Sequence, residues 1–527
     1  MIMKVKSKII LLLIILVTSN IFAQGLPTNY KLESRLNKSS DATPTSNTID
    51  RIFVQDKSTV WIGTSKGLSK TTDGGITWTN YYDTKSFGKE SISAINFGLG
   101  AIWAACWHFE NKLGSDVATG NGLRFSTDGG NSWNEIPQPV DAPGDSSITY
   151  GINKLRALPV TAKEQNFIYD IAFTQNTIWI VSFSGGLRKS TDMGKTWQRV
   201  VLPPDNLDSI KPTDKLDFDL APSSGNLKMR GNLNHRAFSV IAIGDTLYVG
   251  TAGGINKSID GGISWVKFNH TNQANPISGN FVLSMNYNAY DNAIWAATWK
   301  AEGSDEYYGV SFSRNGGKSW DVVLSDERVR DFAFKYKSNF DYDIFAASTS
   351  GIFRSSNKGL SWISSSNIFD ENSKVELKPT LYLSVEVNKL NSNNYEIWVG
   401  TNDGLAKTIE SENEFWNNKW KSFLATSGSV NENQSYAFPN PFNPKFDVAR
   451  IKYNLTNNAS VTLRIFDFGM NLVRTVIQNA SRFQNADQIE FWDGKDENMR
   501  IVPNGVYFYR IDIDDSKVLF GKIIVMM

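Results

Sequence analysis

An eight-residue pattern recurs along this chain and constrains its fold more than any other feature. It reads Ser or Thr, any residue, Asp or Asn, any residue, Gly, two further residues of any kind, and Trp. The six copies end at Trp78, Trp133, Trp197, Trp265, Trp320 and Trp362. Self-similarity of this kind is the signature of a repeat architecture, so the same structural unit is expected several times.

A second, apolar sequence motif precedes each copy of the pattern and occurs once more after the last copy. Its seven copies read VWIGT, IWAAC, IWIVS, LYVGT, IWAAT, IFAAS and IWVGT, beginning at residues 60, 102, 178, 247, 294, 344 and 397. Each follows another alternating apolar run, so one unit comprises four short strands separated by turns. Such a sheet cannot bury both faces alone, and seven sheets stacked around an axis close into a ring. The sequence therefore predicts an all-β fold with a seven-bladed β-propeller over residues 50–425.

The eight-residue pattern falls between the third and the outer strand of each unit, which makes it a hairpin turn. We expect Asp128 to accept backbone N–H groups, Gly130 to take a positive φ, and Trp133 to pack between adjacent blades. The same structural role is assigned to the equivalent positions, which are Asp73, Asp128, Asp192, Asp260, Asn315 and Asn357.

These turns resemble the Asp-box, or bacterial-neuraminidase repeat, of sialidase-like propellers. WIGTSKGL at 61–68 also resembles the repeats of sensor-type propellers of bacterial regulators. The resemblance implies a blade and no particular activity. The seventh unit departs from the pattern, because IESENEFWNNKW at 409–420 contains neither Asp nor Gly, so its turn must be built differently.

The N-terminal segment has the features of a secretory signal peptide. Lys4, Lys6 and Lys8 precede an apolar run at 9–17, and small or polar residues follow up to Ala23. We expect 1–23 to be removed and 24–49 to be a linker. An uncleaved membrane anchor is the alternative, although the run is short for a span of roughly 20 residues.

Charge and cysteine usage narrow the choice of partners. The net charge is +1 and no Lys/Arg cluster is visible, which argues against nucleic acid or an anionic membrane as a partner. The only cysteine is Cys106, so the chain has no disulfide framework. We expect a monomer stabilised by packing alone.

The long insertions all belong to one side of the predicted ring. In a meander, the second-to-third turns and the connections between blades lie on one side, and the Asp-box turns lie on the other. The insertions fall at 107–121, 137–165, 203–234, 299–308 and 367–379. Loops on a rigid scaffold carry function, so the insert-bearing side is the expected binding surface.

Two insertions resemble each other and supply candidate ligand-binding residues. IWAACWHFENKLGSD and IWAATWKAEGSDEYYG both place an additional Trp beyond the second strand. Aromatic rings beside carboxylates suit sugar rings, so these insertions predict binding by Trp107, His108, Glu110, Trp299, Tyr307 and Tyr308. The alternative is that both tryptophans only cap their hairpins and shield the core.

Charged pairs at the start of the inner strands form a second candidate set. They are Asp50-Arg51, Tyr169-Asp170, His235-Arg236 and Arg330-Asp331. Of these, His235, Arg236, Arg330 and Asp331 are expected to bind an anionic or polar ligand. A set of satisfied ion pairs at the mouth of the ring is the alternative.

Catalytic signals are weak. The Phe/Tyr-Arg-Ile-Pro motif of sialidases is absent, and GTSKG at 63–67 joins two strands instead of forming a nucleophile elbow. His108, His235 and His270 share no metal-type spacing, so no metal and no cofactor are predicted. No catalytic residue is assigned. If the protein is an enzyme, Glu110 and Asp305 are the candidate carboxylates of a glycoside hydrolase.

The tail changes character after a polar linker at 426–435. Alternating strands and turn signals at Asp493-Gly494 and Asn504-Gly505 predict a small immunoglobulin-like β-sandwich over 436–527. FPNPFNP at 438–444, WDG at 492–494, GVYFY at 505–509 and KIIV at 522–525 resemble the C-terminal sorting domain of type IX secretion. An ordinary adhesive sandwich domain is the alternative.

Together these features predict a secreted or outer-membrane surface protein of bacterial origin. Its expected partners are an extracellular glycan or surface protein and, through its tail, the type IX secretion machinery. A glycoside hydrolase or lyase and a protein-binding assembly or adhesion factor remain alternatives, because one propeller frame hosts many functions.

Overall fold

The computed structural model describes residues 43–527 apart from residues 113, 224–228, 366, 372–374, 426–433, 446–447, 485–486 and 515–516. All of them belong to one compact unit, Ser39–Met527. The predicted signal peptide, most of the linker at 24–49 and most of the linker at 426–435 lie outside the described residues.

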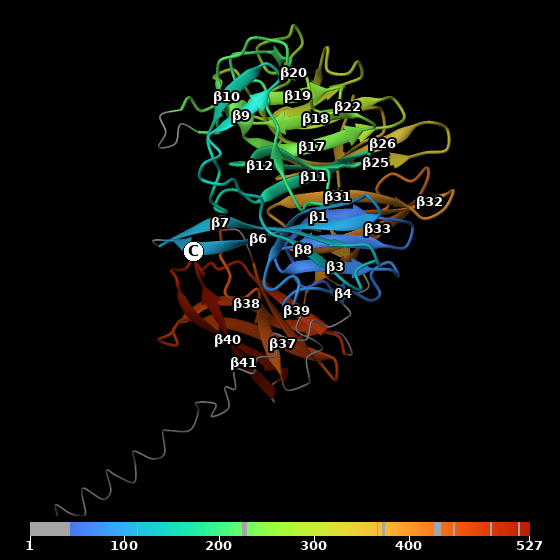
Figure 1. Ribbon diagram of the computed structural model, residues 1–527. Helices are drawn as coiled ribbons and strands as arrows, with labels where there is room; N and C mark the ends of the chain where they lie inside the picture. Colours follow the sequence, from blue (N-terminus) through green and yellow to red (C-terminus); the bar gives the residue numbers. More distant parts are fainter. Residues whose placement is uncertain are drawn as a thin grey trace, which may run out of the picture. The chain divides into compact units, whose positions relative to one another are not determined.

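Seven antiparallel sheets follow one another along the chain from blue to orange in Figure 1, each containing four consecutive strands of a meander. The first contains β1 (Ile49–Val54), β2 (Val60–Thr64), β3 (Gly67–Thr71) and β4 (Thr79–Asn80). The second contains β5 (Ser91–Gly98), β6 (Ala101–Lys112), β7 (Ser115–Ser126) and β8 (Asn134–Ile136). The third contains β11 (Ile168–Thr174), β12 (Thr177–Ser182), β13 (Gly186–Ser190) and β14 (Gln198–Arg199).

The remaining four sheets repeat the order. The fourth contains β17 (Ala237–Ile243), β18 (Thr246–Thr251), β19 (Gly254–Ser258) and β20 (Trp265–Phe268). The fifth contains β21 (Phe281–Asn288), β22 (Ala293–Trp299), β23 (Gly309–Ser313) and β24 (Asp321–Val323). The sixth contains β25 (Val329–Tyr336), β26 (Tyr342–Ser348), β27 (Ile352–Ser355) and β28 (Ile363–Ser364). The seventh contains β31 (Tyr382–Lys389), β32 (Asn394–Thr401), β33 (Gly404–Ser411) and β34 (Lys421–Phe423).

The first strands of these sheets form a closed ring. Each contacts the first strand of the next sheet, and β31 of the seventh sheet contacts β1 of the first. Each first strand carries a register shift near its start, where an extra residue bulges out of the pairing with the second strand. A bulge re-aims the side chains beside it, so the start of every inner strand presents its residues differently from the rest.

The Asp-box turns are held by the same hydrogen bonds in each copy. The hydroxyl at the first position accepts the N–H of the second glycine at 2.8–2.9 Å in all six copies. Asp192 accepts the backbone N–H of Thr196 at 2.9 Å and its hydroxyl at 2.6 Å. These bonds from Thr196 lower the pKa of the Asp192 carboxyl to about 2.

The second glycine of each box lies against the preceding sheet. A Cβ on Gly262 would come within 2.6 Å of the Trp179 ring, and one on Gly359 within 2.7 Å of Trp295. The residue before this glycine is less constrained: a Cβ on Gly261 meets nothing within 4 Å, and Met193 and Lys358 occupy the position in two copies, both at positive φ. Only the second position therefore requires glycine for packing as well as for its φ.

A cation on the third strand completes this contact between neighbouring sheets in three blades. Lys70 donates to the carbonyl of Gly129 at 2.8 Å, and Lys257 donates to that of Gly316 at 2.9 Å. Lys407 donates to the carbonyl of Gly74 at 2.7 Å, which joins the seventh sheet to the first. Each ammonium lies 4.9–5.4 Å from the centre of a second-strand ring, adding a cation–π attraction.

The seventh sheet replaces the Asp-box with a buried ionic clamp. Arg354 of the sixth sheet is fully buried and pairs with Asp343 at 2.6 Å and Glu410 at 2.7 Å. It also donates to the carbonyl of Glu414 at 2.8 Å and lies 5.4 Å from the ring centre of Trp416. The turn after β33 thus contacts the preceding sheet through a guanidinium group instead of a glycine.

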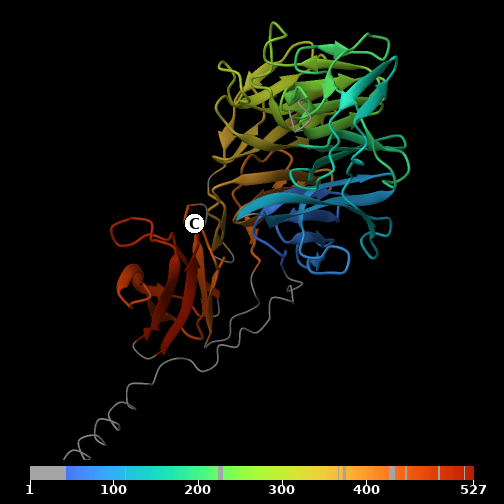
Figure 2. The same cartoon turned by 60° about the vertical axis from the view of Figure 1, so that its left-hand side comes forward.

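The insertions build small additional sheets. β10 (Asn153–Ala157) pairs with β9 (Ser147–Tyr150) on one edge and with β16 (Asp219–Leu220) on the other, while β15 (Ser209–Ile210) extends the fourth sheet beside β20. β29 (Phe369–Asp370) and β30 (Val375–Glu376) form a hairpin. The ends of β6 and β7 continue as a long hairpin, drawn in blue in Figure 2, in which His108 pairs with Thr119 and Lys112 with Ser115.

The C-terminal segment forms two sheets around a core of its own. One contains β35 (Ser435–Phe438), β36 (Ala449–Asn454) and β39 (Asp487–Trp492). The other contains β37 (Ala459–Phe466), β38 (Leu472–Arg482), β40 (Gly505–Ile513) and β41 (Lys517–Val525). Trp492 packs 5.3 Å from Tyr507 and 5.6 Å from Phe442 between their ring centres.

The prediction of an all-β chain is confirmed. Leu233–His235 form a 3-10 turn, and the described residues contain no α-helix. No helix among the described residues has the length and apolarity to cross a membrane.

Substitution of the two neighbouring box glycines tests the packing between sheets. Gly261 and Gly262 have φ of +69° and +79°, but a Cβ on Gly261 meets nothing within 4 Å. We expect Gly261→Ala to cost roughly 1–2 kcal/mol through its φ alone. Gly262→Ala should cost roughly 1–3 kcal/mol more, because its Cβ overpacks Trp179. Thermal unfolding of the full chain measures the difference, and equal losses would contradict the packing argument.

Candidate functional site

Aromatic side chains form a continuous layer on the insert-bearing side, across the second to fifth sheets. Most lie at the start of a first strand or near the end of a second strand, and Tyr308 directly precedes the third strand β23. We name them the aromatic arc, which consists of Phe109, Trp107, Phe167, Tyr169, Phe238, Phe281, Trp299 and Tyr308. Consecutive ring centres in this order are 4.2–6.2 Å apart.

The arc joins the two tryptophans that the sequence singles out. Trp107 stacks on Phe167 at 5.0 Å with an angle of 22°, and Trp299 stacks on Phe281 at 6.2 Å with an angle of 28°. Each indole therefore shares part of its surface with a neighbouring ring, which fixes its orientation. Phe109 remains 64% exposed at one end of the arc.

Arginines lie on the arc. The Arg330 guanidinium is 5.3 Å from the ring centre of Trp299, and that of Arg328 is 4.4 Å from the ring centre of Tyr308. Arg236 lies 5.2 Å from Phe183, which contacts Phe238 of the arc edge-on. Such stacking orients a guanidinium plane and leaves its donors directed outward along the ring.

Four carboxyl groups of the first strands lie near one another, and three of them interact with Arg51; we name the four the axial carboxyls. Asp170 accepts the N–H groups of Ile171 and Val240, and Asp331 accepts those of Phe332 and Val385. Each aspartate thus binds the backbone of its own sheet and of the next. Burial raises the pKa of Asp50, Asp170 and Asp331 to about 6 and that of Glu386 to about 8.

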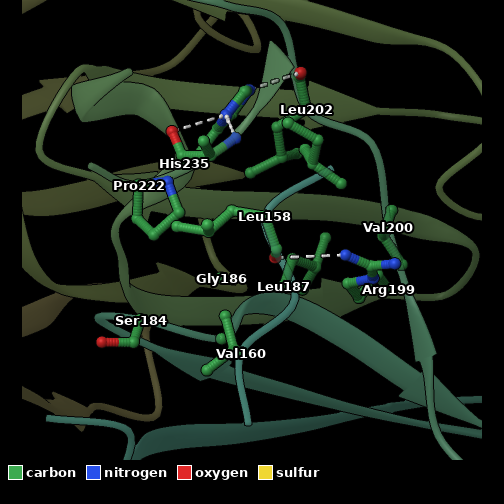
Figure 3. A pocket seen from close by; sticks show the side chains of 13 residues that line it. Leu158, Val160, Ser184, Gly186, Leu187, Arg199, Val200, Leu202, Pro222 and His235 are labelled. Atoms are coloured by element: carbon green, nitrogen blue, oxygen red, sulfur yellow. Dashed lines mark hydrogen bonds between the residues drawn. The ribbon is translucent and has the colours of Figure 1, made fainter. Parts of the chain in front are cut away.

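His235 lies beside a small apolar cavity between the insertions at 137–165 and 203–234, shown in Figure 3. Its Nδ1 accepts the N–H of Ala221 at 3.0 Å, so its Nε2 carries the proton that points to the carbonyl of Leu202 at 3.1 Å. Burial lowers the pKa of His235 to about 4, so the ring is neutral at pH 7. The cavity holds about 20 Å³ for water centres, room for one or two waters.

The other predicted site residues fall into separate places. His108 binds Glu90 through Nδ1 at 2.9 Å, and exposed Glu110 lies 3.5 Å from Lys112. Tyr307 is 37% exposed and lies edge-on to His270, away from the arc. Asp305 is exposed in the fifth sheet's insertion, whereas Glu110 belongs to the second sheet. The arc connects Trp107, Trp299 and Tyr308, and Arg330 lies on it.

Several residues of the site are absent from the sequence-based prediction. Phe167, Phe238 and Phe281 link the two tryptophans, and Arg328 joins Arg330. Their shared signal is an aromatic or basic residue at the start of a first strand. Repeat alignment by the Asp-boxes alone does not reveal it. No group of three or more potential metal-ligating side chains occurs among the described residues.

The fold has solved counterparts. An ancestral GH74 enzyme matches at 13% identity and a TM-score of 0.51, over 92% of this chain and 63% of that chain. YCF48 bound to a D1 peptide matches at 15% identity and a TM-score of 0.40, over 70% and 93%. PorZ, a surface component of the type IX secretion system of Porphyromonas gingivalis, matches at 13% identity and a TM-score of 0.32, over 91% and 75%.

The fold is that of the β-propellers. At these identities the likeness concerns the fold alone. No protein-family model matches the chain, and no curated protein does. The chemistry of the site must therefore be argued from its own residues.

The axial carboxyls predict how stability depends on pH. An unfolded Glu has a pKa near 4.3, so between this value and about 8 the folded chain holds a proton on Glu386 that the unfolded chain lacks. Stability should therefore fall as pH rises through this range, by at most about 1.4 kcal/mol per pH unit for this group. Above pH 6.5 the axial aspartates are largely ionised, so Glu386→Gln should flatten the decline between pH 6.5 and 8. Melting temperatures across this window measure it, and an unchanged slope would contradict the assignment.

Proposed function

We propose that the protein is a secreted or cell-surface seven-bladed β-propeller that binds an extracellular polysaccharide across its insert-bearing side. The proposed boundaries are 1–23 for a signal peptide, 50–425 for the propeller and 436–527 for an immunoglobulin-like sorting domain. The aromatic arc carries this proposal. It is a rigid, partly exposed layer of rings spanning four sheets, wide enough to contact several sugar units of a chain.

Polysaccharide recognition fits a surface better than a small-molecule pocket. The cavity beside His235 has room for water only, whereas pockets for drug-sized ligands measure roughly 300–1,000 Å³. An extended ligand gains affinity from many shallow contacts along its length, so an open arc is sufficient. The polar insertions beside the arc offer groups for hydrogen bonds to hydroxyls, among them Glu110 and His108.

Replacement of arc residues tests the binding. We expect the double variant Trp107→Ala, Trp299→Ala to bind its polysaccharide at least tenfold more weakly, a loss of about 1.4 kcal/mol. Because both indoles also pack against neighbours, a second variant removes the 64% exposed end of the arc: Phe109→Ala should weaken binding without affecting the melting temperature. Affinity gel electrophoresis against a polysaccharide panel, including alginate, dextran sulfate and neutral dextran, measures both.

Phe340→Ala is the matched control. Phe340 is 81% exposed and lies in the turn between β25 and β26, on the side of the Asp-box turns. Its removal should leave binding unchanged. If both variants of the arc bind like the wild type, or if no member of the panel binds, the proposed surface is wrong. Release of reducing ends from the panel that is lost in Glu110→Gln or Asp305→Asn would identify the alternative, a glycoside hydrolase.

Export through the C-terminal domain is tested separately. Residues 436–527 have their own core around Trp492, so they are expected to function as a transferable unit. A periplasmic reporter fused to 436–527 should reach the cell surface or medium of a bacterium with type IX secretion. The same fusion should stay in the periplasm of a strain lacking that machinery, and equal release from both strains would contradict the proposal.

A further inference from the structure

The arginines of the arc differ from most others in the ring in lacking acidic partners. Six ring arginines have a carboxylate oxygen within 4.0 Å, and these are Arg124, Arg156, Arg188, Arg199, Arg314 and Arg354. Among the described residues, no carboxylate lies this close to Arg236, Arg328 or Arg330. The three guanidinium groups lie over aromatic rings instead, and Arg236 also donates to the carbonyl of Pro222 at 2.7 Å.

Arg328 and Arg330 form one compact unit with Trp299 and Tyr308. The indole N–H of Trp299 donates to the carbonyl of Val329, the residue between the two arginines, at 2.8 Å. Trp299 and Tyr308 lie edge to face at 5.9 Å, and each carries one of the guanidinium groups. The N–H of Asp326 donates to the carbonyl of Tyr308 at 2.8 Å, which fixes the loop before Arg328.

The unit contains a buried guanidinium nitrogen without an acceptor. The Nε of Arg330 is buried and has no hydrogen-bond acceptor among the described residues. The nearby carboxylate of Glu327 already accepts the Ser348 hydroxyl at 2.6 Å. Burial and the charges of Arg51 and Arg328 lower the pKa of Arg330, while Asp50 opposes this effect. Buried donors without acceptors are rare in native proteins, so a bound group is expected to complete the unit.

We propose that Arg328 and Arg330 bind the anionic groups of an acidic polysaccharide, with Arg236 contacting a further unit of the same chain. This inference rests on the proposed polysaccharide-binding function and specifies its ligand class. A guanidinium fork matches a uronate carboxylate or a sulfate ester with two parallel hydrogen bonds. The arc links Arg236 to Arg330 through Phe183, Phe238, Phe281 and Trp299. The two positions therefore suit charges repeated along one polymer.

Of the four axial carboxyls, Asp50 alone interacts electrostatically with Arg330, and its interaction with Arg51 is the stronger of the two. Asp170 and Asp331 each accept two backbone N–H groups, and both feel the charge of Arg51. Arg51 itself donates to the carbonyl of Asp50 at 3.0 Å. The acidic groups thus belong with Arg51 near the axis, while Arg328 and Arg330 lie with the rings at the insert-bearing end of β25.

Binding of the full chain to alginate, dextran sulfate and neutral dextran tests the inference. We expect binding to alginate, dextran sulfate or both, and at least tenfold weaker binding to dextran. Alginate carries carboxylates and dextran sulfate carries sulfate esters, so these two arms distinguish the anionic groups. Arg328→Gln with Arg330→Gln should weaken binding to the preferred polyanion at least tenfold. Arg330→Lys keeps the charge but loses the fork, and should restore only part of the affinity.

Arg156→Gln is the matched control. Arg156 belongs to β10 within an insertion, is 60% exposed and pairs with Asp219 at 3.6 Å. Its replacement by Gln removes one positive charge, as each of the two arc substitutions does. It should leave binding unchanged. Equal losses in Arg156→Gln and the arc variants would overturn the inference in favour of diffuse charge attraction. Binding to dextran that is as tight as to the polyanions and insensitive to Arg328 and Arg330 would overturn the inference while preserving the proposed function. Failure to bind any of the three would overturn both.

Discussion

The ring depends on one contact repeated between neighbouring sheets, in which the second glycine of a box lies against an apolar side chain of the sheet before it. A four-stranded sheet has two faces to cover, and this contact lets the hairpin turn of one sheet close over the ring of another. The hydroxyl and the carboxylate of the box hold the turn in shape, as Ser258 and Asp260 do around Gly262. The recurrent Trp then packs across the same boundary, as Trp362 does near Trp295 at 6.4 Å.

This contact explains why the turns on the two sides of the ring differ in length. On the box side the turns are short and committed to contacts between sheets, so an insertion there would displace a glycine from its neighbour. The opposite side has no such requirement, and its connections have grown into small sheets such as β9, β10 and β16. The starts of the inner strands lie on this side, and Tyr169, Phe238 and Arg330 occupy three of their bulges. The aromatic arc is formed by residues at these strand starts and at the adjoining insertions.

The repeat was sufficient to predict an all-β chain, because period and turn chemistry are local properties that each unit displays in full. The contacts of the site were not predictable in the same way. Phe167 and Phe281 are ordinary apolar residues in the sequence, and only the ring brings them between Trp107 and Trp299. The polar contacts of buried His235 are a carbonyl at Leu202, directly before the insertion at 203–234, and an N–H at Ala221 within that insertion, which has no repeat. Arg354 shows the same limit, since its partner Glu410 is 56 residues away.

Polar groups near the ring axis and at its rim differ in whether they have hydrogen-bond partners within the fold. At the axis, Asp331 joins two sheets by accepting N–H groups from both, and its charge is balanced within the fold. At the rim, one residue earlier in the same strand, Arg330 lies on an indole with its Nε lacking an acceptor among the described residues. A protein that needed Arg330 only for stability would gain more from an acidic neighbour, as Arg314 has in Asp291. Under the proposed function, the adjacent residues Arg330 and Asp331 thus have a binding role and a structural role within one strand.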